Sequence, residues 1–144
     1  MIKNLEEKVK KLGLSLPEAN APIANYLPYN AHPPLLYVSG QLSTICGKLD
    51  KELSIEQGQE AAKEAVLHVL AQAHKAELEV TKCIRLAGYI NASERFTEHA
   101  QVMNGASDIM AELLGKHARA AFGVASLPLG AAIEIEAQFE IRGA

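Results

Sequence analysis

Apolar residues recur at helical spacing in three stretches of the chain. Residues 2–12 carry an apolar stripe at intervals of three and four residues, which is typical of one face of a helix. The members of this stripe are Ile2, Leu5, Val9 and Leu12. Ser54 and Gln57 fit a capping box at the start of a second helix, which continues to about Lys75. The same spacing predicts a third helix over residues 99–114.

Other stretches have the alternation or the short apolar runs that favour β-strands. These are residues 35–42, 80–91, 118–125 and 132–142. The last is the most regular, with apolar residues on one face and carboxylates on the other. In residues 80–91, alternation predicts Ile84 on the same face as Leu86 and Cys83 on the opposite face. Residues 14–35 hold five prolines, so we expect an extended or irregular path there.

The resulting order is helix, strands, helix, strand, helix and two strands. Long helices that alternate with strands predict an α/β (α+β) fold, a sheet with two helices on one face. The helix residues that should be buried against the sheet are Ala62, Val66, Val69, Val102, Ala106, Ile109 and Leu113. The opposite face of the last strand carries three carboxylates, so it must meet water, a partner or a site.

Composition narrows the classes of function. We expect a single domain over residues 1–144, with residues 1–13 as an N-terminal helix. The net charge of −3 makes nucleic acid a poor partner, because phosphates are bound by clustered Lys and Arg. Cys46 and Cys83 lack the spacing of a metal site or a disulfide framework, so we predict free thiols and no metal or cofactor. With no signal peptide and no membrane-length apolar run, we expect a cytoplasmic protein.

Three segments together resemble one known superfamily. Residues 36–41 read Leu-Tyr-Val-Ser-Gly-Gln, and residues 102–107 read Val-Met-Asn-Gly-Ala-Ser. A C-terminal block joins His117-Ala118-Arg119, a Leu127-Pro128 turn and an Ile-Glu-Ile-Glu-Ala strand at residues 133–137. In this order the segments resemble the RidA/YjgF superfamily, also described as reactive intermediate deaminases or endoribonuclease L-PSP-like proteins. The chain looks like a divergent branch of it.

The resemblance implies a chorismate-mutase-like fold. It also implies a homotrimer whose sheets form a central barrel, with the helices outside and clefts between subunits. The implied reaction is cofactor-free hydrolysis of a 2-imino or 2-enamino acid to a 2-keto acid and ammonia. The partner is then a small substrate that bears a carboxylate. Such chemistry needs a carboxylate clamp and a group that transfers protons.

Two residues match the reacting groups of the family. Arg119 matches its carboxylate-binding arginine, whose planar fork holds a carboxylate through two parallel hydrogen bonds. The alternative is an inter-strand ion pair with Glu134 or Glu136. Glu134 matches the glutamate that positions or activates water, and desolvation or a second carboxylate would raise its pKa toward the working range. The alternative for Glu134 is a solvated strand face, which is the default for Glu136.

Other residues match the walls of the pocket. Tyr26 matches an aromatic residue that closes one side, or is a rim residue. Ser39 and Gly40 match a pair that lines the cleft, where a backbone N–H or a hydroxyl could bind substrate, or they form a simple strand bulge. Asn104 matches a polar helix residue near the pocket, or makes a local hydrogen bond on the helix surface.

Two positions depart from the best-studied deaminases. Ala121 stands where those members have a cysteine, so we expect no thiol in the pocket wall. Alternation places Ala121 on the same face as Arg119. His117 stands where a proline is usual, and it is either a second pocket donor or a surface or interface histidine. The rival function is a non-catalytic trimer that binds a small carboxylated metabolite. Ribonuclease activity is a third reading, which the acidic net charge opposes.

Overall fold

The computed structural model describes residues 2–142, so residues 1 and 143–144 of the predicted domain lie outside the described residues. It holds three α-helices, five strands and one short 3₁₀ turn. In chain order these are α1 (Leu5–Lys11), β1 (Tyr29–His32), β2 (Leu35–Leu42), α2 (Ile55–Lys75), β3 (Glu79–Asn91), α3 (His99–Leu114), β4 (Ala118–Val124), η1 (Pro128–Gly130) and β5 (Ile133–Arg142). The order of long helices and strands predicted from the sequence is confirmed.

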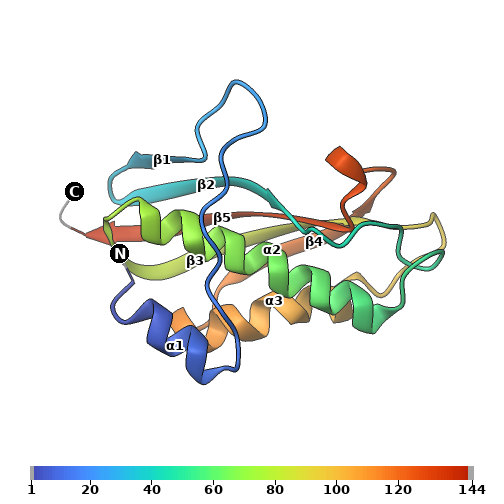
Figure 1. Cartoon of the computed structure of the whole chain (residues 1–144), viewed down its shortest axis with the longest axis horizontal. Coiled ribbons are helices and arrows are strands. Elements are labelled where there is room, and N and C mark those ends of the chain that lie inside the picture. Colours follow the sequence, from blue (N-terminus) through green and yellow to red (C-terminus); the bar gives the residue numbers. More distant parts are fainter. Residues whose placement is uncertain (1, 143–144) are drawn as a thin grey trace.

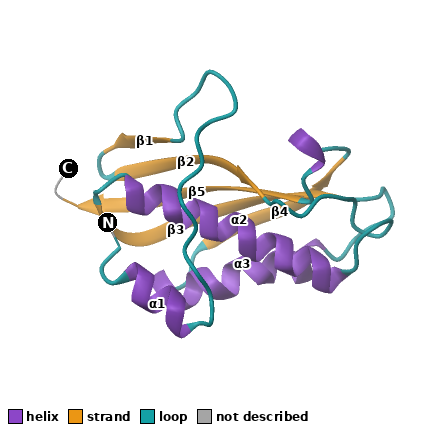
Figure 2. Cartoon of the chain, in the orientation of Figure 1, coloured by secondary structure: helices purple, strands orange, loops and turns teal. Residues whose placement is uncertain are grey.

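The five strands form one mixed sheet in the order β1-β2-β5-β3-β4. Neighbouring strands pair antiparallel, except that β4 runs parallel to β3 at one edge. Helices α2 and α3 lie side by side on one face of this sheet, as predicted (Figures 1 and 2). The other face, called the open face below, has no α-helix over it among residues 2–142.

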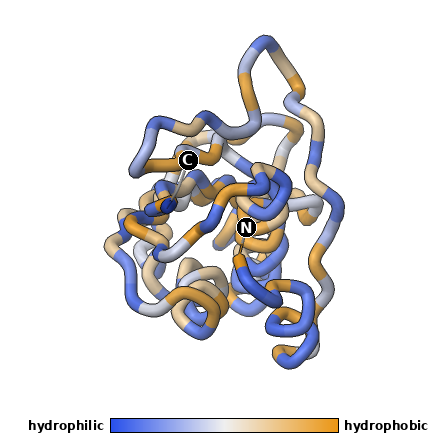
Figure 3. The backbone as a smooth tube through the Cα atoms, turned by 90° about the vertical axis from the view of Figure 1, so that its left-hand side faces the viewer, coloured by the Kyte–Doolittle hydropathy of each residue, from blue (hydrophilic) through white to orange (hydrophobic). Residues whose placement is uncertain are grey.

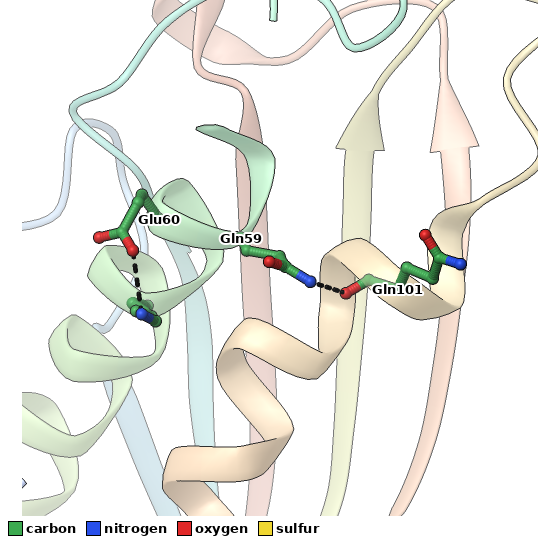
Figure 4. A network of polar contacts seen from close by, with 4 residues as sticks. Gln59, Glu60 and Gln101 are labelled. Carbon is green, nitrogen blue, oxygen red and sulfur yellow. Dashed lines mark hydrogen bonds and ion pairs between the residues drawn. The ribbon is translucent and has the colours of Figure 1, made fainter. Parts of the chain in front are cut away.

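The two long helices approach closely because small residues lie between them. Gly105 is needed there, since a Cβ at this position would meet the backbone of Gln59 in α2, 3.0 Å from its Cα. One turn away, the Gln59 side chain donates a hydrogen bond of 2.9 Å to the Gln101 carbonyl of α3 (Figure 4). The Ser54 capping box at the start of α2 is present, with both of its reciprocal hydrogen bonds.

The core lies between these helices and the sheet. All seven helix residues predicted to be buried are buried. In β5, each apolar residue from Ile133 to Ile141 is buried, while the polar residues between them are partly or fully exposed on the open face. The alternation in the sequence therefore decided which face of β5 meets the helices.

Strand β3 departs from the predicted alternation. Cys83 is buried and Ile84 is only partly buried, the reverse of the prediction. The pairing of β3 with β5 shifts register between Val80 and Lys82 and again between Cys83 and Arg85. Each such irregularity moves the following side chains to the other face, so a strict period of two is wrong across this segment.

A long segment, residues 14–28 and called the strap below, crosses α2 before the chain enters the sheet (Figure 1). Seen from the side in Figure 3, its tip projects beyond the rest of the molecule. Gln72, buried in α2, donates a hydrogen bond of 2.6 Å to the backbone carbonyl of Asn20 and holds the strap in place. No helix within residues 2–142 is long and apolar enough to cross a membrane.

Candidate functional site

A pocket of about 850 Å³ lies between the strap, the end of β2, the η1 turn and the open face of β5. Four residues that the sequence assigned to substrate binding or catalysis line it together: Tyr26, Ser39, Gly40 and Glu134. Tyr26 is 43% exposed and comes from the strap. Leu129 of the η1 turn, 79% exposed, also lines the pocket.

Gly40 makes room for the Glu134 carboxylate. The pairing of β2 with β5 shifts register between Val38 and Gln41, so Ser39 and Gly40 form a bulge. A Cβ at Gly40 would lie 2.8 Å from Cδ of Glu134, too close for two carbon atoms. The sequence left open whether Ser39 and Gly40 form a simple strand bulge or line the cleft. In the structure they do both.

Both hydrogen-bond donors of Ser39 are used within the protein. Its hydroxyl donates to the Leu27 carbonyl at 2.6 Å, and its backbone N–H donates to the Pro28 carbonyl at 3.0 Å. Both donors therefore tie the strap to the end of β2. Neither Ser39 donor is therefore left for a ligand, but the hydroxyl oxygen can still accept a hydrogen bond, so the role of Ser39 in substrate binding stays a prediction.

Two carboxylates face the pocket. Burial raises the pKa of Glu134, and the neighbouring Glu136 carboxylate raises it further. Glu136 accepts a hydrogen bond of 2.7 Å from the Tyr89 hydroxyl, which raises the pKa of Tyr89. The expectation that Glu136 is merely solvated is therefore wrong. The pocket lining holds no Lys, Arg or His, so by itself the pocket favours a cationic or neutral group.

Arg119 lies on the other face of the sheet. It points toward α3, where Nη1 donates to Asn104 Oδ1 at 2.8 Å and to Ser107 Oγ at 3.0 Å. Nη2 donates to the Ala100 carbonyl at 3.2 Å. The alternative of an ion pair between Arg119 and Glu134 or Glu136 is wrong. Of the five N–H donors of a guanidinium, two are left over for a ligand.

The remaining predicted residues lie with Arg119. Asn104 bonds Arg119 rather than its own helix surface. Ala121 is partly buried and packs against the core. His117 contacts Ser107 Oγ through Nε2 at 2.9 Å. Glu134 and this group are on opposite faces, since the neighbours of Glu134 in β5, Ile133 and Ile135, are the ones that face the helices. One chain therefore does not bring Arg119 and Glu134 together.

Sequence reasoning missed two residues here. Cys46 lines the Glu134 pocket, with Sγ near the Thr44 and Leu129 carbonyls, so a thiol is present although position 121 has none. Ser107 bonds Arg119, and the helical interval of three from Asn104 was the available signal. Among residues 2–142, no three His, Cys, Asp or Glu side chains gather as a metal site would need.

Comparisons with known proteins show the family and the fold of this chain. The family model described as Endoribonuclease L-PSP matches residues 17–141. Protein TCP17 of Trypanosoma cruzi is 40% identical, over 93% of this chain and 92% of its own length. A crystal structure of a protein with unknown function from Agrobacterium tumefaciens is 38% identical, with a TM-score of 0.88 over 94% of this chain and 91% of that one. The YjgF gene product of E. coli, 23% identical, shares the fold with a TM-score of 0.65 over 88% of this chain and 94% of that one.

Proposed function

Because the chain belongs to the YjgF/RidA family, whose model is described as Endoribonuclease L-PSP, we propose that it hydrolyses 2-imino or 2-enamino acids to 2-keto acids and ammonia. The observation that carries this proposal is that the Glu134 pocket and the separate Arg119 guanidinium have opposite charges. Within residues 2–142, the Glu134 pocket is lined by carboxylates without a cation, and Arg119 has two N–H donors left over and no acid partner. A substrate with a cationic imine and a carboxylate is complementary to both.

Glu134 is the proton-transfer group in this proposal. The carboxylate takes a proton from water as the water oxygen attacks the imine carbon, which gives a carbinolamine. The protonated Glu134 then returns the proton to the amine nitrogen. The C–N bond breaks with its electron pair on nitrogen, and ammonia leaves. The remaining hydroxyl gives its proton to the Glu134 carboxylate, which passes it to the released ammonia, and the keto acid remains. A raised pKa suits a group that must both accept and return a proton.

A second copy of the chain completes the site in the proposal. Arg119 and the Glu134 pocket lie on opposite faces of the sheet, so Arg119 of one copy must reach the pocket of another. Large apolar side chains around the pocket and the open face support such a contact. Those most exposed are Ile23 at 62%, Leu27 at 63% and Leu129 at 79%, with Phe122 at 49% on β4. We propose a homotrimer, and a monomer mass by light scattering at micromolar concentration would contradict it.

A pair of variants with matched controls tests the assignment. A broad amino-acid oxidase or a dehydratase generates the imine in the presence of the protein, and keto-acid release is timed. Arg119→Lys should weaken pyruvate binding about 10- to 150-fold, because a lost hydrogen bond to a charged group is worth roughly 1.5–3 kcal/mol. Glu134→Gln should keep binding and lose roughly 100-fold or more in turnover. Arg142→Lys and Glu140→Gln, the same changes at exposed positions of β5, should leave both unchanged.

A non-catalytic trimer that senses a carboxylated metabolite is the second candidate, and Ala121 in place of the usual cysteine favours it. Carboxylate binding that depends on Arg119, with no turnover in the wild type, would select this candidate. Ribonuclease activity is the third, and two carboxylates in a pocket without basic residues repel phosphate. The cytoplasmic location stays a prediction.

A further inference from the structure

A chain of polar contacts runs from the start of β4 to the guanidinium of Arg119. His117 Nδ1 lies 3.4 Å from the Gly115 carbonyl, and its Nε2 lies 2.9 Å from Ser107 Oγ. The same Ser107 oxygen lies 3.0 Å from Nη1 of Arg119. Nη1 also donates to Asn104 Oδ1. The Ser107 hydroxyl is thus shared between an arginine and a histidine.

The donors and acceptors of this chain can be assigned in only one fully matched way. Arginine has no acceptor, so Ser107 Oγ must accept from Arg119. The single Ser107 proton is then free to go to His117 Nε2, which accepts it only in the tautomer that carries its proton on Nδ1. In that tautomer Nδ1–H can donate to the Gly115 carbonyl, and each of the four contacts joins a donor to an acceptor.

Helix α3 presents the two acceptors together. Asn104 and Ser107 are three residues apart and lie on the same side of the helix, toward β4. Gly105, between them in sequence, faces α2 instead, where a Cβ would meet the Gln59 backbone. The Asn-Gly-Ala-Ser segment therefore serves two contacts at once, helix packing on one side and the guanidinium on the other.

We infer that Ser107, held by His117, is a positioning residue that orients Arg119 for a carboxylate ligand. Ser107 and Asn104 hold Nη1, and the Ala100 carbonyl takes one proton of Nη2. The N–H donors left over are Nε–H and one N–H of Nη2, and both are available to a carboxylate. This inference rests on the proposed role of Arg119 as the carboxylate clamp.

The test compares Ser107→Ala, Ser107→Thr and His117→Phe with Ser15→Ala, a change at an exposed serine outside the network. Pyruvate is the probe, and its dissociation constant is measured by calorimetry on the full chain. Ser107→Ala and His117→Phe should weaken binding roughly 3- to 10-fold, the range for one neutral hydrogen bond. Ser107→Thr keeps the hydroxyl and should restore binding, and Ser15→Ala should bind as the wild type does.

A second measurement needs no ligand. Nitrogen NMR of the His117 ring should report the tautomer with the proton on Nδ1, and pyruvate should shift the Nε2 signal in the wild type but not in Ser107→Ala. A proton on Nε2 would overturn this assignment of donors and acceptors, because Ser107 would then accept hydrogen bonds from both His117 and Arg119. The positioning role itself is decided by the affinities, and if Ser107→Ala does not fold, His117→Phe decides it.

The outcomes separate this inference from the proposed function. If Ser107→Ala and His117→Phe bind pyruvate as tightly as the wild type while Arg119→Lys binds it weakly, the positioning role of Ser107 is overturned. The proposed role of Arg119 as the carboxylate clamp then still stands. If the wild type and Arg119→Lys bind pyruvate equally, or neither binds it, the clamp itself fails and the inference falls with it.

Discussion

Replacement of Gly40 by alanine tests the Glu134 pocket most directly. Gly40 has no positive φ, so its backbone conformation is open to alanine. The new Cβ would lie 2.8 Å from Cδ and 3.1 Å from Cγ of Glu134, and would overlap the carboxylate oxygen Oε1. Carbon atoms pack at roughly 3.5–4.0 Å, so the Glu134 side chain must rotate out of its place.

The structure predicts a large effect on turnover and a small one on stability. Overpacking typically costs about 1–3 kcal/mol of the free energy of unfolding, but a half-buried glutamate can move away, so we expect about 1 kcal/mol or less. Turnover should fall roughly 100-fold or more, because the proton-transfer group no longer reaches the imine carbon. Urea denaturation measures the first quantity and the coupled keto-acid assay the second.

Gly88→Ala is the matched control. Gly88 is also a strand glycine, but its Cβ would lie 2.7 Å from Cε of Met103 in the core. This variant should lose stability by about 1–3 kcal/mol while each folded molecule keeps its turnover. Wild-type turnover in Gly40→Ala would refute the reasoning, since the carboxylate would then work from elsewhere. A Gly40→Ala stability loss as large as that of Gly88→Ala would mean that the Glu134 side chain has as little room to move away as Met103 has in the core.

Three further predictions concern protonation, packing and the thiols. Burial and the Glu136 carboxylate raise the pKa of Glu134 in the folded state above its unfolded value, so its ionised form opposes folding. Glu134→Gln should therefore increase the free energy of unfolding at pH values above the folded pKa, with no gain below the unfolded pKa; a pH-independent difference in urea denaturation would contradict this. Ile109 is 6% exposed, and Ile109→Ala should lower the free energy of unfolding by roughly 1–4 kcal/mol; a change under about 0.5 kcal/mol would mean that the site collapses around the smaller residue. Burial raises the pKa of the Cys83 thiol to about 12, so a thiol reagent should modify exposed Cys46 alone until the protein unfolds. The double variant Cys46→Ser, Cys83→Ser should keep its turnover per folded molecule, and its loss would give a thiol a role in the reaction.

Several features of this protein could be predicted from the sequence because they depend on neighbours along the chain. The Ser54 capping box, the apolar faces of α2 and α3 and the alternation of β5 are local patterns, and the structure has them at the predicted residues. The resemblance carried by the motif segments identified the family, four residues of the pocket lining (Tyr26, Ser39, Gly40 and Glu134), and Asn104 beside the guanidinium.

Other features depend on which strands pair and in what register, which no local pattern determines. The irregular pairing of β3 with β5 brought Cys83 into the core in place of Ile84. The direct pairing of β3 with β5 placed Tyr89 beside Glu136, and the turn before β5 brought Cys46 to the Glu134 pocket. The tertiary structure also separated Arg119 from Glu134, since β4 turns Arg119 toward the helices and β5 turns Glu134 away from them. Side-chain direction alternates within each strand, but which face meets the helices is decided only when the sheet and helices pack together.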